Sequence, residues 1–279
     1  MKTISLYSKS VARAGVNTMA AIKTGLQRLG YTIREQDDKC DMAVICSTLW
    51  NGRMAPNREV FFNYTKSGRN VLVFDAGALN RGKLWRLGIN AIHREGYFGP
   101  KGNDDTRRRR LGIELKPWKK NGKNLLICLQ HSKSYQWRGQ PHLSVWANKI
   151  VEVARREGWS NIAVRPHPRD PFVNMVGIKI ITPKSIGEDE FDLVSCIQNY
   201  GAVVNFSSNV GIIAAIHGIP VFVGERSLAF DVRSGNLNNL KLVDYPDREK
   251  WINDFVYTEW TNEEIAEGSP ISRLLEGKC

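Results

Sequence analysis

The chain has 279 residues, of which 42% are hydrophobic and 24% charged, as in an ordinary globular protein, and its formal net charge is +12. This composition excludes a disordered tail protein, a collagen-like fibre and a coiled coil, and the length predicts one large or two ordinary domains. No apolar run is long enough for a membrane span, and the N-terminal segment lacks the apolar core of a secretory signal.

The first part of the chain alternates between predicted strands and helices. We expect strands over residues 2–7, 31–33, 42–46 and 71–74, and helices over 15–29 and 56–66. Because strands that alternate with helices form βαβ units, this pattern predicts a parallel sheet with helices on both faces.

Between residues 96 and 122 the pattern breaks. This stretch holds turn formers and charged side chains, including four consecutive arginines at 107–110, and has no sustained apolar period. We interpret it as an interdomain linker with an exposed basic loop.

After residue 122 the alternation resumes. Strands are expected over 124–130, 161–165, 178–181, 202–206 and 221–223, helices over 143–158, 191–199 and 209–217, and a helical tail over 246–275. The predicted fold class is therefore α/β, with two Rossmann-like doubly wound domains that face a cleft. The expected divisions are a first Rossmann-like domain at 1–98, a basic linker at 99–122, a second Rossmann-like domain at 123–245, and C-terminal helices at 246–279 that pack back across the domains.

Positive charge is concentrated before residue 121. Residues 1–120 carry 23 basic and 10 acidic side chains, whereas residues 121–279 carry 17 and 18. Such asymmetry favours a polyanion partner for the first part, although a solvated basic surface is the alternative.

The five cysteines, at positions 40, 46, 128, 196 and 279, have no metal-binding spacing. They are typical of reduced thiols in a cytoplasmic protein, and we expect no metal site.

Two polar motifs of the second domain lie where predicted strands end. Ser207, Ser208 and Asn209 stand between a strand and a helix, where free backbone N–H groups and the helix dipole favour an anion. His167 lies between Arg165 and Arg169 at the end of another strand, a position suited to a diphosphate leaving group. The alternatives are a plain helix cap and an ordinary loop histidine.

Arg-x-His-Pro-Arg, followed by Ser-Ser-x-x-Gly and Gly-Ile-Pro-Val, resembles the nucleotide-sugar half of GT-B glycosyltransferases over roughly residues 124–225. The likeness is greatest to the transferases of capsular polysaccharide synthesis. It implies that His167, Ser207 and Ser208 hold the donor phosphates. The family often has a glutamate for the donor ribose where this chain has Ile213, so either Glu225 binds the ribose or the donor differs.

The whole chain is also similar to a group of phage-encoded proteins that share Trp-Asn-Gly-Arg-Met-Ala-Pro-Asn-Arg at 50–58 and Leu-Gly-Ile-Glu-Leu-Lys-Pro-Trp at 111–118. That resemblance implies a glycosyltransferase-like fold and a link to modified phage DNA.

The first domain contains a candidate base and candidate acceptor ligands. Asp75 ends a buried strand, which suits a general base, with Asp104 and Asp105 as rivals on a more flexible loop. A structural turn residue is the alternative for Asp75. The expected DNA ligands are Asn51, Arg53, Asn57, Arg107, Arg108, Arg109, Arg110, Lys116 and Lys119.

Together these features predict a phage DNA glycosyltransferase, present in the host cytoplasm. It would move a sugar, with inversion, from a nucleotide-sugar, expected to be UDP-linked, to a hydroxymethylated base flipped out of the DNA. No metal or other cofactor is expected. The alternatives are a transferase for a polysaccharide or small acceptor, and a non-catalytic DNA-binding protein on the same scaffold.

Overall fold

The computed structural model describes residues 2–171, 175–187, 190–242 and 244–276. The chain forms two compact units: unit 1 comprises residues 1–107 and 253–279, and unit 2 comprises residues 108–252. Both units are α/β, as the sequence predicts. The acceptor and donor roles expected for them stay predictions. Two helices, α3 (Thr106–Arg110) and α7 (Glu249–Phe255), span the points where the chain passes from one unit to the other.

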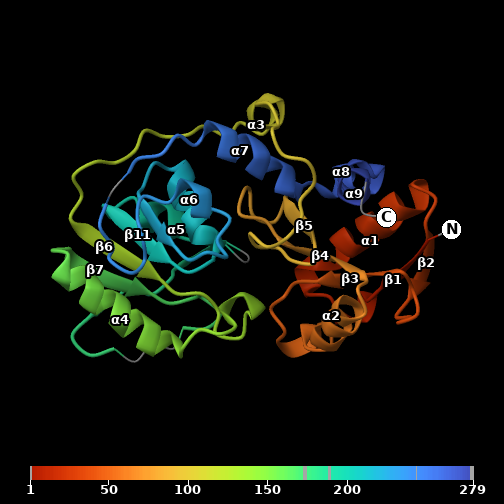
Figure 1. Ribbon diagram of the computed structural model, residues 1–279, viewed down its shortest axis with the longest axis horizontal. Helices are drawn as coiled ribbons and strands as arrows, with labels where there is room; N and C mark the ends of the chain where they lie inside the picture. Colours follow the sequence, from red (N-terminus) through yellow and green to blue (C-terminus); the bar gives the residue numbers. More distant parts are fainter. Residues whose placement is uncertain (1, 172–174, 188–189, 243, 277–279) are drawn as a thin grey trace. The chain divides into compact units, whose positions relative to one another are not determined.

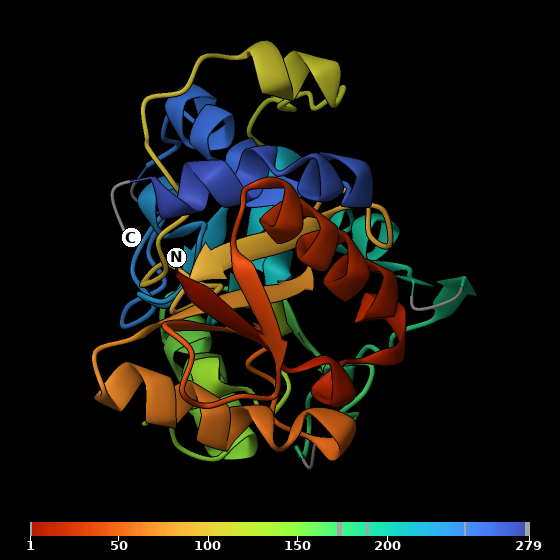
Figure 2. The same ribbon diagram turned by 90° about the vertical axis from the view of Figure 1, so that its right-hand side faces the viewer.

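Unit 1 is built on a six-stranded sheet with the order β13-β5-β4-β3-β1-β2. Its strands are β1 (Thr3–Leu6), β2 (Thr32–Glu35), β3 (Met42–Cys46), β4 (Asn70–Ala76), β5 (Trp85–Ile89) and β13 (Glu259–Trp260). Its helices are α1 (Val16–Arg28), α2 (Asn57–Lys66), α8 (Asn262–Glu267) and α9 (Ser269–Leu275), with short 3-10 turns at Ser8–Ser10, Arg13–Gly15, Gly52–Met54 and Val256–Thr258. Figure 2 shows α1, α8 and α9 on one face of the sheet and α2 on the other.

The sheet of unit 1 is mixed, not wholly parallel as the sequence predicts. β2, β1, β3 and β4 run parallel, but β5 is antiparallel to β4, and β13 is antiparallel to β5. Only residues 77–84 connect β4 to β5, and a connection that short, without a helix, suits an antiparallel neighbour. The expectation of an entirely helical tail is wrong at β13, which completes the sheet.

Unit 2 contains a five-stranded parallel sheet with the order β12-β11-β6-β7-β8. Its strands are β6 (Asn124–Cys128), β7 (Ser160–Arg165), β8 (Lys179–Ile180), β11 (Ala202–Asn205) and β12 (Val221–Val223), with a separate hairpin of β9 (Ser185–Gly187) and β10 (Glu190–Phe191). Its helices are α4 (Leu143–Arg156), α5 (Leu193–Ile197) and α6 (Asn209–Ile216), with 3-10 turns at Tyr135–Trp137 and Phe230–Val232. Figure 1 shows α4 on one face of this sheet and α5 and α6 on the other.

Each unit has its own apolar core. In unit 1 the core lies between the sheet and α1, α8 and α9, with Ile22, Leu72 and Ile271 among its buried members. In unit 2 the amphipathic helix α4 buries Trp146 and Ile150 against the strands. Burial of such side chains, at about 25 cal/mol per Å² of apolar surface, holds both sheets in place.

The division into units changes where the charge lies. Unit 1 carries 19 basic and 15 acidic side chains, a net charge of +4, because the acidic residues of 253–279 belong to it. Unit 2 carries 21 and 13, a net charge of +8, because the chain from Arg108 to Lys120 belongs to it. The first part of the sequence is therefore the more basic part, but of the two units it is unit 2 that carries the larger positive charge.

Candidate functional site

The candidate site lies at the carboxyl edge of the unit 2 sheet. Strand order reverses between β6 and β11: the chain adds β7 and β8 on one side of β6 and then β11 and β12 on the other. Ligands of doubly wound sheets bind at such a switch point, outside the carboxyl ends of the strands. Polar side chains follow β6, β7 and β11 at this edge.

Gln130 and Ser207 connect the ends of the two central strands. The Gln130 Oε1 atom accepts hydrogen bonds from the Ser207 backbone N–H at 3.1 Å and from Ser207 Oγ at 2.9 Å. Ser207 Oγ is also 2.9 Å from Oε1 of Gln136, in the turn that precedes α4. Both side chains of the central pair are buried. Ser207 therefore fixes the edge of the sheet, and its hydrogen-bonding groups are already engaged.

Ser208 is the N-cap residue of α6, but its side chain does not cap the helix. Its Oγ instead lies 3.1 Å from Asn205 Nδ2, from which it accepts a hydrogen bond. The Gly211 N–H donates to the Ser208 carbonyl at 3.3 Å, whereas the Ser208 hydroxyl caps no N–H group of the first turn, and a helix N-terminus without a side-chain cap favours an anion. The alternative of a plain serine cap does not describe this geometry.

Gly211 lets α6 approach the sheet closely. A Cβ atom at this position would lie 2.7 Å from Asn205 Oδ1 and 2.9 Å from a methyl group of Val223. This contact gives a physical reason for the glycine of the Ser-Ser-x-x-Gly motif: a side chain would push the helix N-terminus away from the strand ends.

His167 lies in a tight turn at the end of β7. Its Nδ1 atom accepts a hydrogen bond from the Arg169 backbone N–H at 3.1 Å, and its carbonyl accepts one from Asp170 at 2.9 Å. The ring is half-buried, and Arg169 is exposed. The turn thus orients the imidazole at the same sheet edge as the start of α6.

The sequence analysis missed His131, Gln130 and Asp170 at this edge. His131 follows β6 after Leu129 and Gln130, and its ring centroid is 5.3 Å from that of His167. Asp170 lies 3.5 Å from His131 Nδ1. The signal that could have found His131 and Gln130 is the one used for the serines, since Gln130 ends the predicted strand 124–130 and His131 follows it.

The three other residues predicted to bind the donor, Arg165, Glu225 and Asn209, differ in their burial. Arg165 is 4% exposed, and its guanidinium forms a 2.6 Å ion pair with Asp192. Burial alone would raise the pKa of Asp192, but hydrogen bonding and charge from Arg165 outweigh it, and the pKa is lowered. The Arg165 guanidinium is therefore engaged within unit 2, whereas Glu225 is exposed and follows β12 after Gly224. Asn209 is half-buried at the first position of α6.

Asp75, the predicted base, lies near the carboxyl end of β4 in unit 1. Its Oδ2 atom accepts a 2.7 Å hydrogen bond from Ser47 Oγ, and its Oδ1 accepts the Ala76 backbone N–H at 2.7 Å. Ser47 follows β3 with a positive φ of 62°, which is uncommon for a residue with a side chain. The carboxylate is therefore held in a fixed orientation and remains half-buried. Its rival Asp104 caps α3 by accepting the Thr106 N–H at 3.0 Å, and Asp105 precedes that helix.

The predicted acceptor ligands of the loop after β3 separate into two groups. Asn51 and Arg53 are exposed. Asn57 is fully buried, and its Nδ2 donates to the carbonyls of Ser10 and Cys46 at 2.8 Å each. Asn57 therefore joins backbone segments inside unit 1, and its amide is not available to an acceptor.

The arginine run is a short helix, α3, and not the exposed loop that the sequence predicts. Arg107 is 2% exposed, pairs with Glu264 at 2.6 Å and lies over the Trp260 ring at 3.9 Å. Arg108 is half-buried and pairs with Glu249 at 2.5 Å. Only Arg109 and Arg110 of the run are exposed. Arg107 is consequently removed from the proposed phosphate ligands.

Lys116 and Lys119 belong to a segment that is fixed to unit 2. Their backbone N–H groups donate to the carbonyls of Ile216 and Gly218, at the end of α6. Lys119 Nζ also donates to the carbonyls of Gln198 and Tyr200 at 3.0 Å each. Lys116 is exposed and forms a 3.0 Å ion pair with Glu114.

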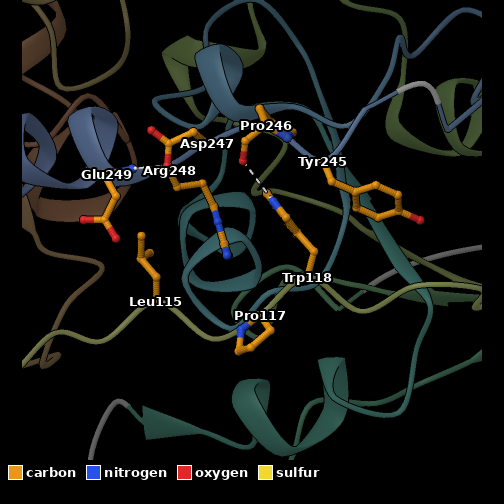
Figure 3. A pocket seen from close by; sticks show the side chains of 8 residues that line it. All are labelled: Leu115, Pro117, Trp118, Tyr245, Pro246, Asp247, Arg248 and Glu249. Carbon is orange, nitrogen blue, oxygen red and sulfur yellow. Dashed lines mark hydrogen bonds between the residues drawn. The ribbon is translucent and has the colours of Figure 1, made fainter.

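A pocket of about 370 Å³ lies beside this segment (Figure 3). Arg248 crosses it, with its guanidinium 3.9 Å from the Trp118 ring centroid, and donates to the carbonyls of Ala215 and Lys116. Trp118 Nε1 donates to the Pro246 carbonyl at 2.9 Å. The pocket is lined by Leu115, Pro117, Trp118, Tyr245, Pro246, Asp247, Arg248 and Glu249. None of these is a predicted donor ligand. We therefore interpret the pocket as a structural feature, in which Arg248 and Trp118 join residues 115–118 to residues 245–249 within unit 2.

Comparison with solved structures identifies the fold. The β-Kdo 2,4 transferase of Thermosulfurimonas dismutans KpsC aligns over 92% of this chain and 90% of its own, at 11% identity and a TM-score of 0.54. The β-Kdo 2,7 transferase of the same KpsC aligns over 100% of both chains, at 13% identity and a TM-score of 0.52. No family model and no curated protein matches the sequence. These structural likenesses confirm the predicted α/β fold of the GT-B type.

No three His, Cys, Asp or Glu side chains among the described residues are grouped so as to hold a metal ion. No helix in the described ranges has the length and apolar character that crossing a membrane requires.

Proposed function

We propose that this protein is a sugar transferase that uses a nucleotide-activated donor bound at the carboxyl edge of the unit 2 sheet. The observation that carries the proposal is the convergence of the α6 N-terminus with two histidines at the switch point of the sheet. Such a set of groups suits a phosphate, because it combines helix N–H groups with imidazole donors. The KpsC likenesses support the proposal, since those proteins are described as Kdo transferases.

In this mechanism the residues of unit 2 stabilise the departing phosphate. His167 and the first turn of α6 donate hydrogen bonds to the phosphate oxygens as the bond to the sugar breaks. Ser207 acts through its bonds to Gln130, which hold the start of α6 against β6. Arg169 supplies positive charge at the exposed side of the turn.

Asp75 is the proposed general base for the acceptor hydroxyl. Ser47 donates to one carboxylate oxygen and the Ala76 N–H to the other, which leaves further lone pairs on each oxygen for a substrate proton. We expect Asp75→Asn to retain nucleotide binding and to reduce sugar transfer by roughly 10²–10⁴-fold, the usual contribution of a positioned base. Transfer at the parent rate would place the base elsewhere.

For the acceptor we propose DNA that carries a hydroxymethylated base. The net charge of +12 and the exposed Arg53, Arg109 and Arg110 support an anionic polymer. A polysaccharide acceptor is the second candidate, and the burial of Arg107 favours it by removing one cation from the proposed DNA surface.

The experiment that tests the function is direct. The protein is incubated with a panel of nucleotide-sugars and hydroxymethylated DNA, and the digested nucleosides are weighed by mass spectrometry. A mass increase of one sugar on the modified nucleoside supports the full proposal. Transfer to a glycan but not to DNA selects the second candidate. Failure to transfer or hydrolyse any donor contradicts the proposal that the protein is a sugar transferase.

A separate measurement tests the proposed DNA surface. The double variant Arg109→Ser, Arg110→Ser should weaken DNA binding and flatten the dependence of log affinity on log salt by up to about 0.9 per lost phosphate contact. The matched control replaces Arg155 and Arg156, which are exposed on α4, and should leave the slope unchanged. Equal slopes in parent and double variant would assign the run to ordinary solvated surface.

A further inference from the structure

His131 and Asp170 form a pair beside the proposed phosphate ligands. His131 is 8% exposed, and Asp170 Oδ2 lies 3.5 Å from its Nδ1 atom. The His131 ring meets the His167 ring at an interplanar angle of 62°. Asp170 is fixed in turn, because it accepts the Ser132 backbone N–H at 2.7 Å. A buried imidazole with a carboxylate on one side therefore adjoins the donor edge.

The hydrogen bonds of His131 determine which nitrogen faces which partner. Nδ1 accepts a hydrogen bond from the Lys133 backbone N–H at 3.2 Å, so the neutral ring carries its hydrogen on Nε2. A second proton can bind only at Nδ1, where Asp170 Oδ2 is the adjacent acceptor. Protonation would exchange the Lys133 contact for a charged contact with Asp170.

Burial is the main reason why His131 is neutral in the absence of a ligand. Burial lowers the pKa of His131, and Lys133 and Arg169 lower it further, whereas Asp170 acts in the opposite direction. Burial alone would raise the pKa of Asp170, but hydrogen bonds from Ser132, together with His131 and His167 once these rings are protonated at acidic pH, outweigh it, and the pKa is lowered. Asp170 is therefore ionised, and a second negative charge beside His131 would favour the protonated ring.

We propose that His131 takes up a proton when a nucleotide phosphate occupies this edge, with Asp170 as the carboxylate that holds the imidazolium. The inference rests on the proposed donor site. A bound phosphate brings negative charge to the side of the ring opposite Asp170, so the charged ring is stabilised from both sides. The proton comes from solvent and adds to Nδ1, and Nε2–H remains a donor to the phosphate.

Calorimetry in buffers of different ionisation enthalpy tests this proposal. At about pH 7.5, where an unliganded His131 is neutral, the slope of binding enthalpy against buffer enthalpy gives the protons taken up per UDP or CMP bound. We expect net uptake in the parent protein and its loss in His131→Gln, with weaker nucleotide binding. Asp170→Asn retains an acceptor for the Ser132 N–H but removes the charge, so it should also reduce the uptake.

The controls separate this inference from the proposed function. His217, at the end of α6, also has a pKa lowered by burial, and His217→Gln should leave the uptake unchanged. Nucleotide binding without proton uptake, or uptake that persists in His131→Gln and Asp170→Asn, would overturn the inference alone. Uptake abolished only in His167→Gln would assign the proton to His167 and would overturn it as well. If UDP, ADP, GDP, TDP and CMP all fail to bind, the donor site itself is contradicted. Should His131→Gln fail to fold, Asp170→Asn decides.

Discussion

Gln130 Oε1 accepts both the backbone N–H and the side-chain hydroxyl of Ser207, across the point where the strand order of unit 2 reverses. One buried amide oxygen thus sets the distance between the end of β6 and the start of α6. The proposed phosphate site depends on that distance, because its donors come from both sides of the reversal.

Gln130→Ala should therefore reduce both stability and nucleotide binding. The buried N–H of Ser207 would lose its acceptor, which costs about 1–3 kcal/mol in the free energy of unfolding. Urea denaturation measures this cost, and calorimetry measures nucleotide affinity. Gln198→Ala is the matched control, since that side chain is exposed on unit 2. Similar results for the two variants would show that Gln130 is not a positioning residue.

Gly211→Ala tests the close approach of α6 to the sheet. Its methyl group would lie 2.7 Å from Asn205 Oδ1, so the helix must shift, and we expect a loss of about 1–3 kcal/mol in the free energy of unfolding. Gly187→Ala is the control, because a Cβ there would meet nothing nearer than 3.4 Å. Thermal unfolding of both variants gives the comparison, and an unchanged Gly211 variant would contradict the packing described.

Arg107→Ser should destabilise the protein, whereas Arg110→Ser should not. The first substitution removes a buried partner of Glu264 and Trp260, and breaking such a pair costs at least about 3 kcal/mol. The exposed Arg110 should contribute within about 0.5 kcal/mol. Denaturation midpoints distinguish the two positions. If both variants are as stable as the parent, Arg107 has no structural role.

The stability of the protein should fall between about pH 7.5 and 5.5, partly because of His131. Burial lowers the pKa of this histidine in the folded state, so the unfolded chain binds a proton first as the pH drops through about 6.5. His131→Gln should therefore show a smaller loss of unfolding free energy over this range. His217→Gln should remove its own share in the same direction. A pH dependence identical to that of the parent in His131→Gln would contradict the prediction.

His167→Ala should weaken nucleoside-diphosphate binding by about 1–3 kcal/mol, the scale for losing a charge-assisted partner. Its ring is held by the Arg169 N–H, so the side chain is already oriented before a ligand arrives. Calorimetry with UDP measures the change, and circular dichroism checks that the turn has not unfolded. Unchanged affinity would remove His167 from the donor site.

Strand and helix positions were largely predictable from the sequence because they depend on local periodicity. Examples are the unbroken apolar run of β3 and the helical spacing of the apolar residues in α4. β5 escaped prediction because its sequence, Trp-Arg-Leu-Gly-Ile, contains an arginine and a glycine. Arg86 is tolerated there because it pairs with Glu259, far along the chain.

The candidate site was predictable only where a residue acts through its own position at a strand end. Ser208 and His167 lie at the predicted edge for that reason. The burial of Asn57 and Arg107 depends on partners that no local pattern reveals: the carbonyl of Ser10 for one and Glu264 for the other. The polar type of a residue alone did not show whether its side chain is exposed to a ligand or is buried and bonded to partners inside the protein.

Glu259 has a consequence for the order in which the protein is made. Its carboxylate accepts the backbone N–H groups of Ala78 and Leu79 and pairs with Arg86, at the β13 edge of a sheet whose other strands precede residue 90. Unit 2 is one continuous stretch, so a ribosome delivers all of its strands before it reaches residue 259. Unit 1 begins synthesis first but receives its last strand afterwards. The earlier-made sheet must therefore wait, with the amide groups of Ala78 and Leu79 still solvated, until the distal segment emerges.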